Sequence, residues 1–481
     1  MADSQTETVT SGVPADKVTL DNTLPKGWDK EGTFVGRVMI PGVGPAIVRL
    51  EKNGTLTDIT ETYSTMSKLC AEADPAAAAW KAEGKSLGKL SDILAASPTD
   101  QRTGKTPHLL APIDLQTVKA AGVTFAVSLV QRMVEEEAEK TGRPAKQIEE
   151  EIEAVIGGSL RELEPGTEKA LKLLDHIKAP KKPDGVVIPQ NMVEEIKDIV
   201  AGGVAGVASH GAKILEYLGL IAKGPDIDPK KQYGLGLSHH YPAVGLGKLA
   251  EIFTKADTLA CVGHGSDSGY LAASNWNNPE PEVVVVTSPT GKIVGATLGN
   301  DINHRDIEGY SALLLGECKN QKGSCVVGPF IRLFDNSFSI KDVNTMDVEL
   351  EIKGNDNFTL SGQKNSMSQI SRSPEALTKQ MYSEGKEYKD GAALFCGTMF
   401  VPKYRHGEEK FAHKEGDIVT IKTDKLGSLT SQMVHCPKVS QPEPGLSELM
   451  ENLAERKLLS RGPEWGSKVA KHHGYSAGLS A

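Results

Sequence analysis

One segment constrains the fold more than any other. Four consecutive valines and a threonine at residues 283–287 are followed by Pro289-Thr290-Gly291 and a second largely apolar run at 293–298. Two strand-length apolar runs around a proline–glycine turn predict a β-hairpin. Short apolar segments with glycine turns recur over residues 233–435, where helical patterns are few. The second half of the chain is therefore predicted to be mostly β.

The pattern changes along the rest of the chain. Residues 34–40 and 45–50 have the composition of paired strands, and an Asn53-Gly54 turn follows them. Helical periodicity dominates residues 127–220, which most simply form a packing or lid subdomain. We therefore expect an α+β protein in five segments: a flexible leader (1–33), a small β-rich N-terminal unit (34–125), a helical insertion (126–232), a catalytic domain (233–437) and a C-terminal tail (438–481).

Composition narrows the functional classes. The net charge is −9, with 54 Lys and Arg against 63 Asp and Glu, and no basic block offsets it, which argues against a nucleic-acid role. The six cysteines are scattered without a CxxC pair, a pattern typical of free thiols in a reducing compartment. The polar N-terminal stretch lacks a secretory signal, and no apolar run has the length of a membrane span. We therefore expect a cytoplasmic protein that binds neither nucleic acid nor membranes.

Carboxylates beside the open end of the predicted hairpin indicate a metal site. Glu280 and Glu282 are two residues apart, so in an extended chain they project from one face. Pro281 between them cannot donate to a ladder and favours a strand start or an edge. The return strand brings Asp301 back to the same end. Three carboxylates are hard ligands suited to Mg²⁺, Mn²⁺ or Ca²⁺ rather than zinc, although acidic residues at strand ends are also common on surfaces.

Several motifs around these carboxylates occur in the order found in one family. Glu280-Pro281-Glu282, followed by Asn300-Asp301-Ile302-Asn303-His304-Arg305-Asp306, resembles the ExE and NDxxxRD signatures of the fumarylacetoacetate hydrolase superfamily. The elements that follow are also similar to those of the family: a loop from Lys319 to Gly328-Pro329, Gly397-Thr398 with Pro402, Glu415-Gly416-Asp417, and Leu426-Gly427-Ser428-Leu429. The resemblance extends over residues 235–435.

The resemblance implies a fold, an assembly and a branch of the family. It implies a catalytic domain built as a mixed β-sheet roll or barrel, and a homodimer. The segments 121–125 and 291–295 look more like those of the 2-keto-3-deoxy sugar acid dehydratases. The C–C bond hydrolases of the family usually carry a His, often with a Glu three residues on, after their equivalent of Gly122. Residues 124–131 contain neither His nor Glu, which counts against hydrolysis and leaves the general base unassigned.

A dehydratase of this kind removes a proton from C3 of a 2-keto acid and expels the C4 hydroxyl. A metal chelated by the carboxylate and the keto oxygen would polarise the carbonyl and stabilise the enolate. Following the family's motifs, we expect Lys319 to supply a cation or carry a proton, and Thr398 to donate a hydrogen bond to the substrate. His264, which lies between two glycines, is a candidate general base. The candidates for substrate contact are Lys255, Thr124 and Arg305.

Other interpretations remain open at this stage. A hydrolase or decarboxylase of a 2,4-diketo acid would use the same metal site and release two carbon fragments. A non-catalytic metabolite-binding protein would bind chelating acids without turnover. Arg305 is more simply explained by a bidentate ion pair with Asp306, and His264 by a structural role in its loop. One of the residues 135–137, all glutamates, is a further candidate for the missing acid–base group.

Overall fold

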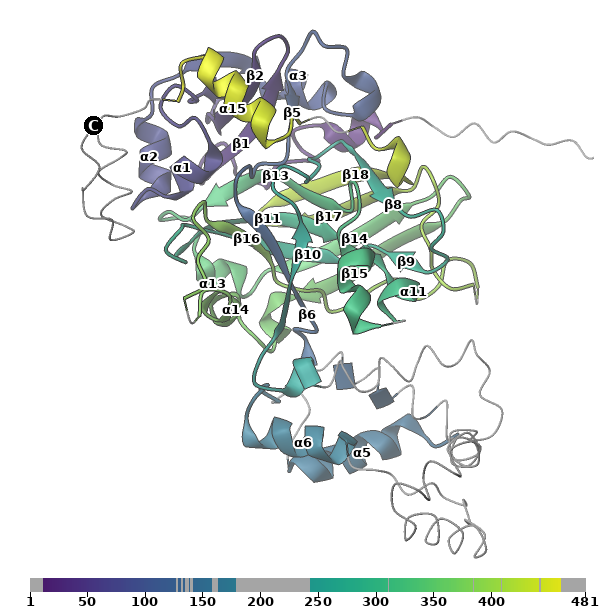
Figure 1. Cartoon of the computed structure of the whole chain (residues 1–481). Coiled ribbons are helices and arrows are strands. Elements are labelled where there is room, and N and C mark those ends of the chain that lie inside the picture. Colours follow the sequence, from purple (N-terminus) through teal and green to yellow (C-terminus); the bar gives the residue numbers. More distant parts are fainter. Residues whose placement is uncertain are drawn as a thin grey trace, which may run out of the picture.

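The computed structural model describes residues 12–126, 129, 130, 133, 134, 138, 142–157, 163–178, 243–309, 311–383, 385–407, 409–440 and 443–459. These residues form an α+β protein with two β-sheets stacked in one body, which confirms the predicted class (Figure 1). Both sheets are open. The glutamates at 135–137 and most of the predicted insertion lie outside the described residues.

The larger sheet has eleven strands and joins the N-terminal unit to the body. The strands are β1 Thr33–Ile40, β2 Gly44–Leu50, β3 Thr55–Asp58, β4 Lys85–Lys89, β5 His108–Leu109, β6 Thr117–Gly122, β7 Glu251–Ala256, β10 Pro281–Thr287, β11 Ile293–Asp301, β13 Cys325–Leu333 and β16 Ala392–Phe395. Their order is β4-β3-β2-β1-β13-β11-β10-β16-β6-β7, with β5 beside β1. Because β1 pairs with β13, the strands predicted for the N-terminal unit continue the sheet that carries the candidate metal ligands.

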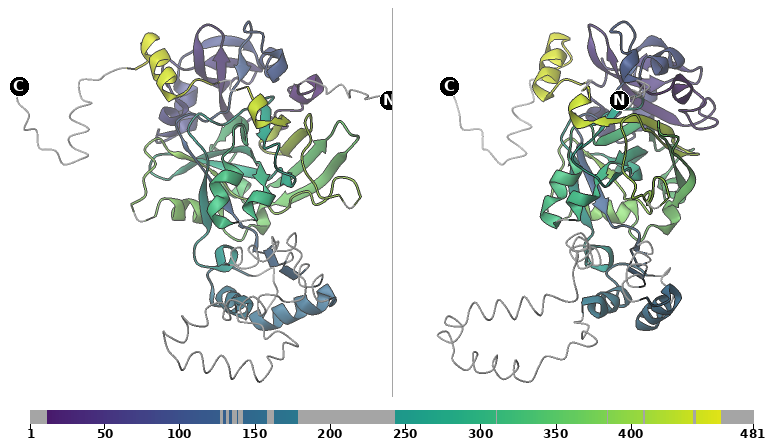
Figure 2. Two further views of the ribbon diagram at one scale, coloured as in Figure 1. Left: turned by 45° about the vertical axis from the view of Figure 1, so that its right-hand side comes forward. Right: turned by 90° about the vertical axis from the view of Figure 1, so that its right-hand side faces the viewer.

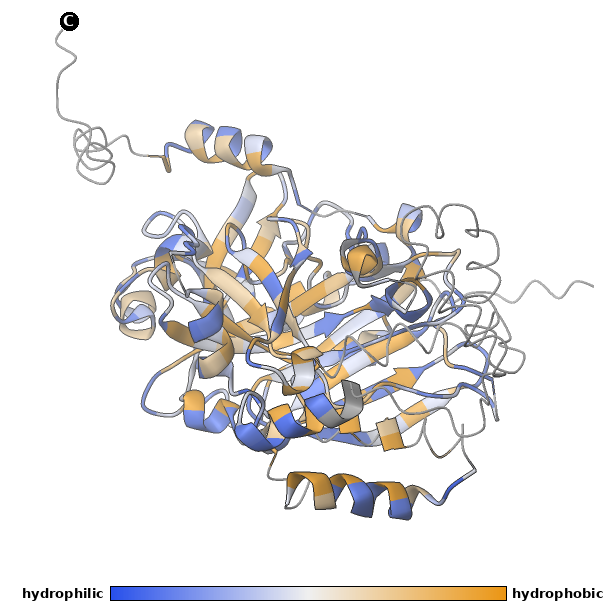
Figure 3. Ribbon diagram, turned by 60° about the horizontal axis from the view of Figure 1, so that its bottom comes forward, coloured by the Kyte–Doolittle hydropathy of each residue, from blue (hydrophilic) through white to orange (hydrophobic). Residues whose placement is uncertain are grey.

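The second sheet has five strands in the order β15-β14-β17-β18-β8. The bounds are β8 Asp267–Tyr270, β14 Asp347–Lys353, β15 Thr359–Ser366, β17 Ile418–Thr423 and β18 Gly427–His435, and a small two-stranded sheet pairs β9 Asn277–Asn278 with β12 Asn303–His304. The pairing of β10 with β11 confirms the hairpin predicted from the proline–glycine turn, and β14 pairs with β15 in a second hairpin. Figure 3 shows hydrophobic residues concentrated along the strands of the body.

The valine run of β10 is buried on both faces of the large sheet. Val283 and Val285 enter the core shared with β14 and β17. Val284 and Val286 enter a separate core with helices α1 (Met66–Cys70) and α2 (Pro75–Lys81). Each fully buried valine contributes about 1.5 kcal/mol or more to stability. This two-sided burial explains why the strand is a continuous apolar run rather than an alternating one.

Helices lie around the sheets and in the insertion. The remaining α-helices are α3 Leu90–Ala95, α5 Ala145–Ile156, α6 Glu168–Lys178, α11 Arg305–Glu308, α12 Leu315–Lys319, α13 Ile340–Val343, α14 Pro374–Met381 and α15 Leu446–Glu455, with short 3₁₀ segments at Ala15–Val18, Thr99–Gln101, Ala312–Leu314, Met367–Gln369 and Cys436–Lys438. Helices α5 and α6 lie outside the body of sheets and share an apolar cluster of their own (Figure 1, Figure 2). Among the described residues, no helix combines the length and the apolar character needed to cross a lipid bilayer.

Both terminal segments pack more closely than the sequence indicated. In the segment predicted to be a flexible leader, Val13, Val18 and Leu24 are buried. These apolar residues are too sparse to form a sequence pattern, so the leader prediction fails for residues 12–32. At the other end, Glu443 pairs with buried Arg37 on β1, and α15 packs through two leucines.

Candidate metal centre

The β10–β11 hairpin brings the three predicted metal ligands together. Glu282 lies opposite Gly299 in the ladder, and the backbone N–H of Asp301 donates to the carbonyl of Glu280 (3.0 Å). Asn300 accepts a hydrogen bond from the backbone N–H of Glu280 (3.0 Å) and holds the start of the strand. One carboxylate oxygen from each of Glu280, Glu282 and Asp301 lies within 4.8 Å of the other two. The convergence predicted from the sequence is confirmed.

The electrostatics of this cluster favour a bound divalent cation. Burial raises the pKa of Glu282 well above its usual value, and the charges of Asp301 and Glu280 raise it further. Burial also raises the pKa of Glu280, and the ammonium of Lys319 only partly offsets this. Buried carboxylates that repel one another are stabilised when a cation lies between them. An all-oxygen donor set of this kind fits Mg²⁺, Mn²⁺ or Ca²⁺.

Two buried lysines compensate part of the negative charge. Lys319 Nζ lies 2.6 Å from Glu280 Oε2 and 2.9 Å from Asp301 Oδ2. Burial lowers the pKa of Lys319, but Asp301 and Glu280 outweigh burial and hold it well above its usual value. A protonated Lys319 fits the expected role of a cation or of a proton donor.

The structure corrects the predicted role of Lys255 as a substrate contact. It is fully buried, pairs with Asp301 Oδ1 (2.9 Å) and donates to the carbonyls of Ile302 (3.1 Å) and Lys319. Because its ammonium lies behind Asp301 and is fully engaged by these oxygens, Lys255 positions the ligand and the Lys319 helix instead of contacting substrate. The sequence around a lysine does not show whether its side chain faces the open or the closed side of a site.

Glu251 is a further candidate for the site, and the sequence analysis missed it. It begins β7, on which Phe253 lies under the Lys319 ammonium (5.4 Å to the ring centroid). Burial raises the pKa of Glu251 to about 7, and Glu308, Glu280 and Asp301 raise it while Lys319 lowers it. A carboxyl group with this pKa next to the metal ligands can accept and return protons near neutral pH. The spacing of Glu251 and Phe253, two residues apart in a short segment, was the available signal.

The far side of the site is built by the Gly397-Thr398 turn. The backbone N–H of Gly397 donates to Glu282 Oε2 (2.6 Å) and fixes the orientation of that carboxylate. Thr124, a predicted substrate contact, is buried and donates to the carbonyl of Cys396 (2.7 Å), so it supports this turn instead. Thr398 is half-buried beside the cluster, where a substrate-binding role remains a prediction.

Two further predicted site residues have structural contacts. His264 is fully buried, accepts from the backbone N–H of Thr430 (3.1 Å) and bonds Thr23 (3.3 Å), so it joins the N-terminal segment to β18. Burial lowers its pKa to about 4. His264 is therefore a neutral histidine with a structural role, and not the predicted general base. Arg305 lies over the ring of Trp276 (5.3 Å), and Asp306 accepts from Ser274 and Asn275, so the expected Arg305–Asp306 pair is not formed.

His304 supports the loop between the metal ligands and Lys319. Its Nε2 accepts from the backbone N–H of Leu271 (2.9 Å), so Nδ1 carries the proton and donates to the carbonyl of Cys318 (2.8 Å). Burial lowers the pKa of His304 to about 4. The neutral imidazole therefore ties β12 to α12, whose last residue is Lys319.

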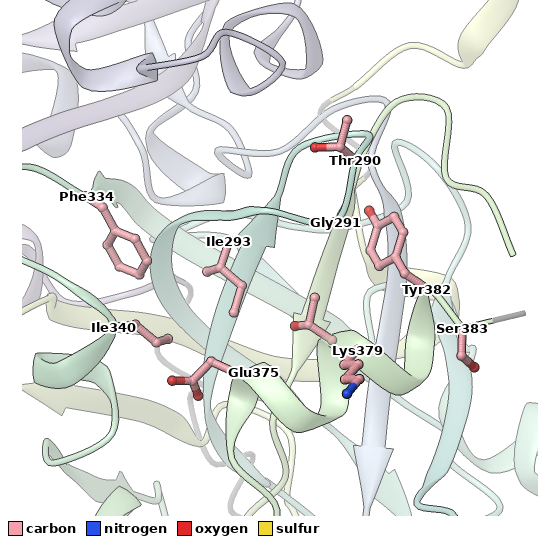
Figure 4. A pocket seen from close by; sticks show the side chains of 10 residues that line it. Thr290, Gly291, Ile293, Phe334, Ile340, Glu375, Lys379, Tyr382 and Ser383 are labelled. Atoms are coloured by element: carbon pink, nitrogen blue, oxygen red, sulfur yellow. The ribbon is translucent and has the colours of Figure 1, made fainter. Parts of the chain in front are cut away.

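A cavity of about 620 Å³ lies at the opposite end of the β10–β11 hairpin. Its walls come from the hairpin turn and α14, with Ile293, Phe334 and Ile340 on the apolar side (Figure 4). The seven residues of β10 separate it from the carboxylates by roughly 20 Å. The candidate chemistry is therefore confined to the other end of the hairpin.

Comparison with known sequences assigns the family. Residues 278–434 match the fumarylacetoacetate (FAA) hydrolase C-terminal domain. The chain is similar to the 2-dehydro-3-deoxy-D-arabinonate dehydratase of Saccharolobus solfataricus, with 30% identity over an alignment of 233 residues that covers 44% of this chain and 75% of that protein. The chain belongs to the fumarylacetoacetate hydrolase family. A probable 2-keto-3-deoxyxylonate dehydratase of Haloferax volcanii is 29% identical over 183 residues, 38% of this chain and 60% of that protein.

Solved structures share the fold of this family member. An apo structure of 2-keto-3-deoxy-D-arabinonate dehydratase superimposes with a TM-score of 0.52 at 19% identity, over 84% of this chain and 99% of that chain. The same enzyme complexed with magnesium and 2,5-dioxopentanoate gives a TM-score of 0.51 at 18% identity, with the same shares covered. These likenesses support the sheet architecture described above.

Proposed function

We propose that this protein is a magnesium-dependent dehydratase that acts on a 2-keto-3-deoxy sugar acid. The observation that carries the reaction type is Glu251, a carboxyl group with a pKa of about 7 beside three converging carboxylates and a protonated lysine. It supplies the base that the sequence lacked between residues 124 and 131. The dehydratase relatives support the substrate class.

Each residue of the site has a separate role in the proposed reaction. Glu280, Glu282 and Asp301 would hold Mg²⁺, which supplies Lewis-acid polarisation of a 2-keto acid when bound. Ionised Glu251 takes the C3 proton of the substrate, and the C4–oxygen bond then breaks. The departing hydroxyl takes up a proton from Glu251 or from the Lys319 ammonium and leaves as water. Burial of the cluster excludes bulk water that would compete for these protons.

A turnover assay tests this proposal. The protein is incubated with Mg²⁺ and a panel of 2-keto-3-deoxy pentonates and hexonates, and the products are identified by NMR and mass spectrometry. Loss of one water from at least one acid, abolished by a chelator and by Glu251→Gln, is the expected result. Release of two carbon fragments from a 2,4-diketo acid would instead make the protein a hydrolase or decarboxylase. Binding of these acids without any turnover would make it a metabolite-binding protein.

We also propose a cytoplasmic homodimer with the five-segment organisation described above, adjusted for the packed leader. All six cysteines are free thiols, and Cys261 and Cys325 share an S–H···S hydrogen bond of 3.4 Å instead of a disulfide. Neighbouring reduced thiols support a reducing compartment. Light scattering after size-exclusion chromatography would give twice the mass of 51.4 kDa for a dimer.

A further inference from the structure

Asn365 connects the second sheet to the candidate metal centre. It lies on β15, is almost fully buried, and reaches out of its own sheet toward the Gly397-Thr398 turn. Its Nδ2 donates to Thr398 Oγ1 (2.8 Å) and makes a longer contact with the carbonyl of Pro281 (3.4 Å). Its Oδ1 accepts from the backbone N–H of Met399 (3.1 Å). One amide thus contacts both the hairpin start and the turn that orients Glu282.

These partners determine which way the amide faces. The N–H of Met399 can only donate, so the Asn365 atom beside it is the oxygen. The carbonyl of Pro281 can only accept, so the nitrogen lies on the other side, toward Thr398. Thr398 Oγ1 therefore receives a hydrogen bond from Asn365, and one of its two lone pairs is occupied.

The hydrogen bond from Asn365 determines where the hydroxyl proton of Thr398 points. With Oγ1 already accepting, the Thr398 proton points away from Asn365 and is donated to the carbonyl of Phe400 (3.0 Å). Rotation about the Cβ–Oγ bond can redirect this proton to another acceptor at small cost, because hydroxyl hydrogens rotate freely between partners. Thr398 directly follows Gly397, whose N–H binds Glu282, so that acceptor would lie beside the metal ligands.

We propose that Asn365 is a positioning residue that makes Thr398 a hydrogen-bond donor toward an acceptor oxygen, carboxylate or keto, of the acid in the metal centre. This inference rests on the proposed function, because it needs a 2-keto acid in the site. Asn365 itself does not touch the substrate. It favours groups that accept at this position, because one lone pair of Thr398 Oγ1 is already occupied while the hydroxyl proton can be redirected.

The test reverses the hydrogen bond. Asn365→Asp has the same shape and still accepts from Met399, but its ionised second oxygen accepts from Thr398 and draws the hydroxyl proton away from the site. Binding of oxalate, which carries two adjacent acceptor groups, to the Mg²⁺-loaded protein is measured by calorimetry. We expect Asn365→Asp to weaken oxalate binding about tenfold, which corresponds to the loss of one hydrogen bond to a charged group. Asn365→Ala, which adds no charge, should weaken it less.

A double-mutant cycle separates this role from a general effect of charge or packing. In a Thr398→Ser background the hydroxyl is kept, and Asn365→Asp should again weaken oxalate binding about tenfold. In a Thr398→Val background the hydroxyl is gone, and Asn365→Asp should have almost no further effect. An equal loss in both backgrounds would overturn the inference. Failure of the wild type to bind oxalate with Mg²⁺ would overturn the proposed function and this inference together, whereas binding without coupling would overturn the inference alone.

Discussion

Glu251 and Gly122 face each other across β6 and β7, and a Cβ atom at position 122 would lie 2.2 Å from Oε2 of Glu251. The missing side chain therefore makes room for the carboxylate beside the metal ligands. The glycine backbone is not in the left-handed region, so space and not conformation requires glycine here. This pairing explains why the 121–125 segment contributes to the site although its own side chains do not reach the carboxylates.

Gly122→Ala should displace Glu251 and slow turnover while leaving the metal site intact. We expect kcat to fall by about 10²-fold, since a misplaced general base loses most of its contribution. The Mg²⁺ dissociation constant should stay within about twofold, because the three ligands lie on other strands. Steady-state kinetics and calorimetry measure the two quantities. Gly445→Ala is the matched control, as an added Cβ there meets no atom within 4 Å. Equal kcat in both variants would contradict this placement of Glu251.

Glu251→Gln should change both activity and the pH dependence of stability. The turnover number should fall by about 10²- to 10⁴-fold, because glutamine cannot take a proton. The folded pKa of about 7 lies above the ordinary value near 4.3, so the folded protein takes up a proton between these values. Stability is therefore lost as pH rises from about 4.3 to about 7, and the variant should avoid this loss.

Chemical denaturation of the metal-free protein tests the stability part. At about pH 8 the free energy of unfolding of Glu251→Gln should exceed that of the wild type by up to about 3 kcal/mol, and near pH 4 the two should agree. Exposed Glu375 provides the control substitution, Glu375→Gln. A difference that is the same at both pH values would show that the carboxyl is not buried as described.

The features that were predicted correctly from the sequence are those that depend on a local pattern. The valine run, the turn residues and the spacing of Glu280, Glu282 and Asp301 are read along one hairpin, and the structure confirmed them. The resemblance to a family also led to Lys319, which the structure places on two of these carboxylates.

The errors concern residues whose role depends on distant segments. Lys255 and His264 both looked suited to catalysis, but one lies behind Asp301 and the other bonds Thr23 from the N-terminal segment. Glu251 was missed because its partner Gly122 precedes the whole helical insertion. Strand pairing over such separations is set by tertiary packing, which periodicity in one sequence does not reveal.

Removal of one metal ligand should stabilise the metal-free protein and abolish its response to magnesium. Burial and the neighbouring Asp301 and Glu280 carboxylates make an ionised Glu282 costly, and Glu282→Gln removes that cost while keeping an oxygen for the Gly397 N–H. At a Mg²⁺ concentration about 100 times its dissociation constant, the wild type should gain about 2.7 kcal/mol and the variant almost nothing. Thermal unfolding with and without Mg²⁺ measures both. A wild type whose unfolding temperature does not respond to Mg²⁺, Mn²⁺ or Ca²⁺ would refute the metal centre.

Lys255→Met tests whether Lys255 supports Asp301 or contacts substrate. The substitution removes the 2.9 Å partner of Asp301 Oδ1 and leaves Lys319 as the remaining cation on this buried carboxylate, so the free energy of unfolding should fall by about 3 kcal/mol. Because Lys255 is fully buried, the KM of the remaining active fraction should change by no more than about twofold. Denaturant unfolding and substrate titration give the two values. Lys119→Met, on the neighbouring strand and bonded only to Thr254 among the described residues, serves as control. A large rise in KM without loss of stability would restore the substrate contact that the sequence predicted for Lys255.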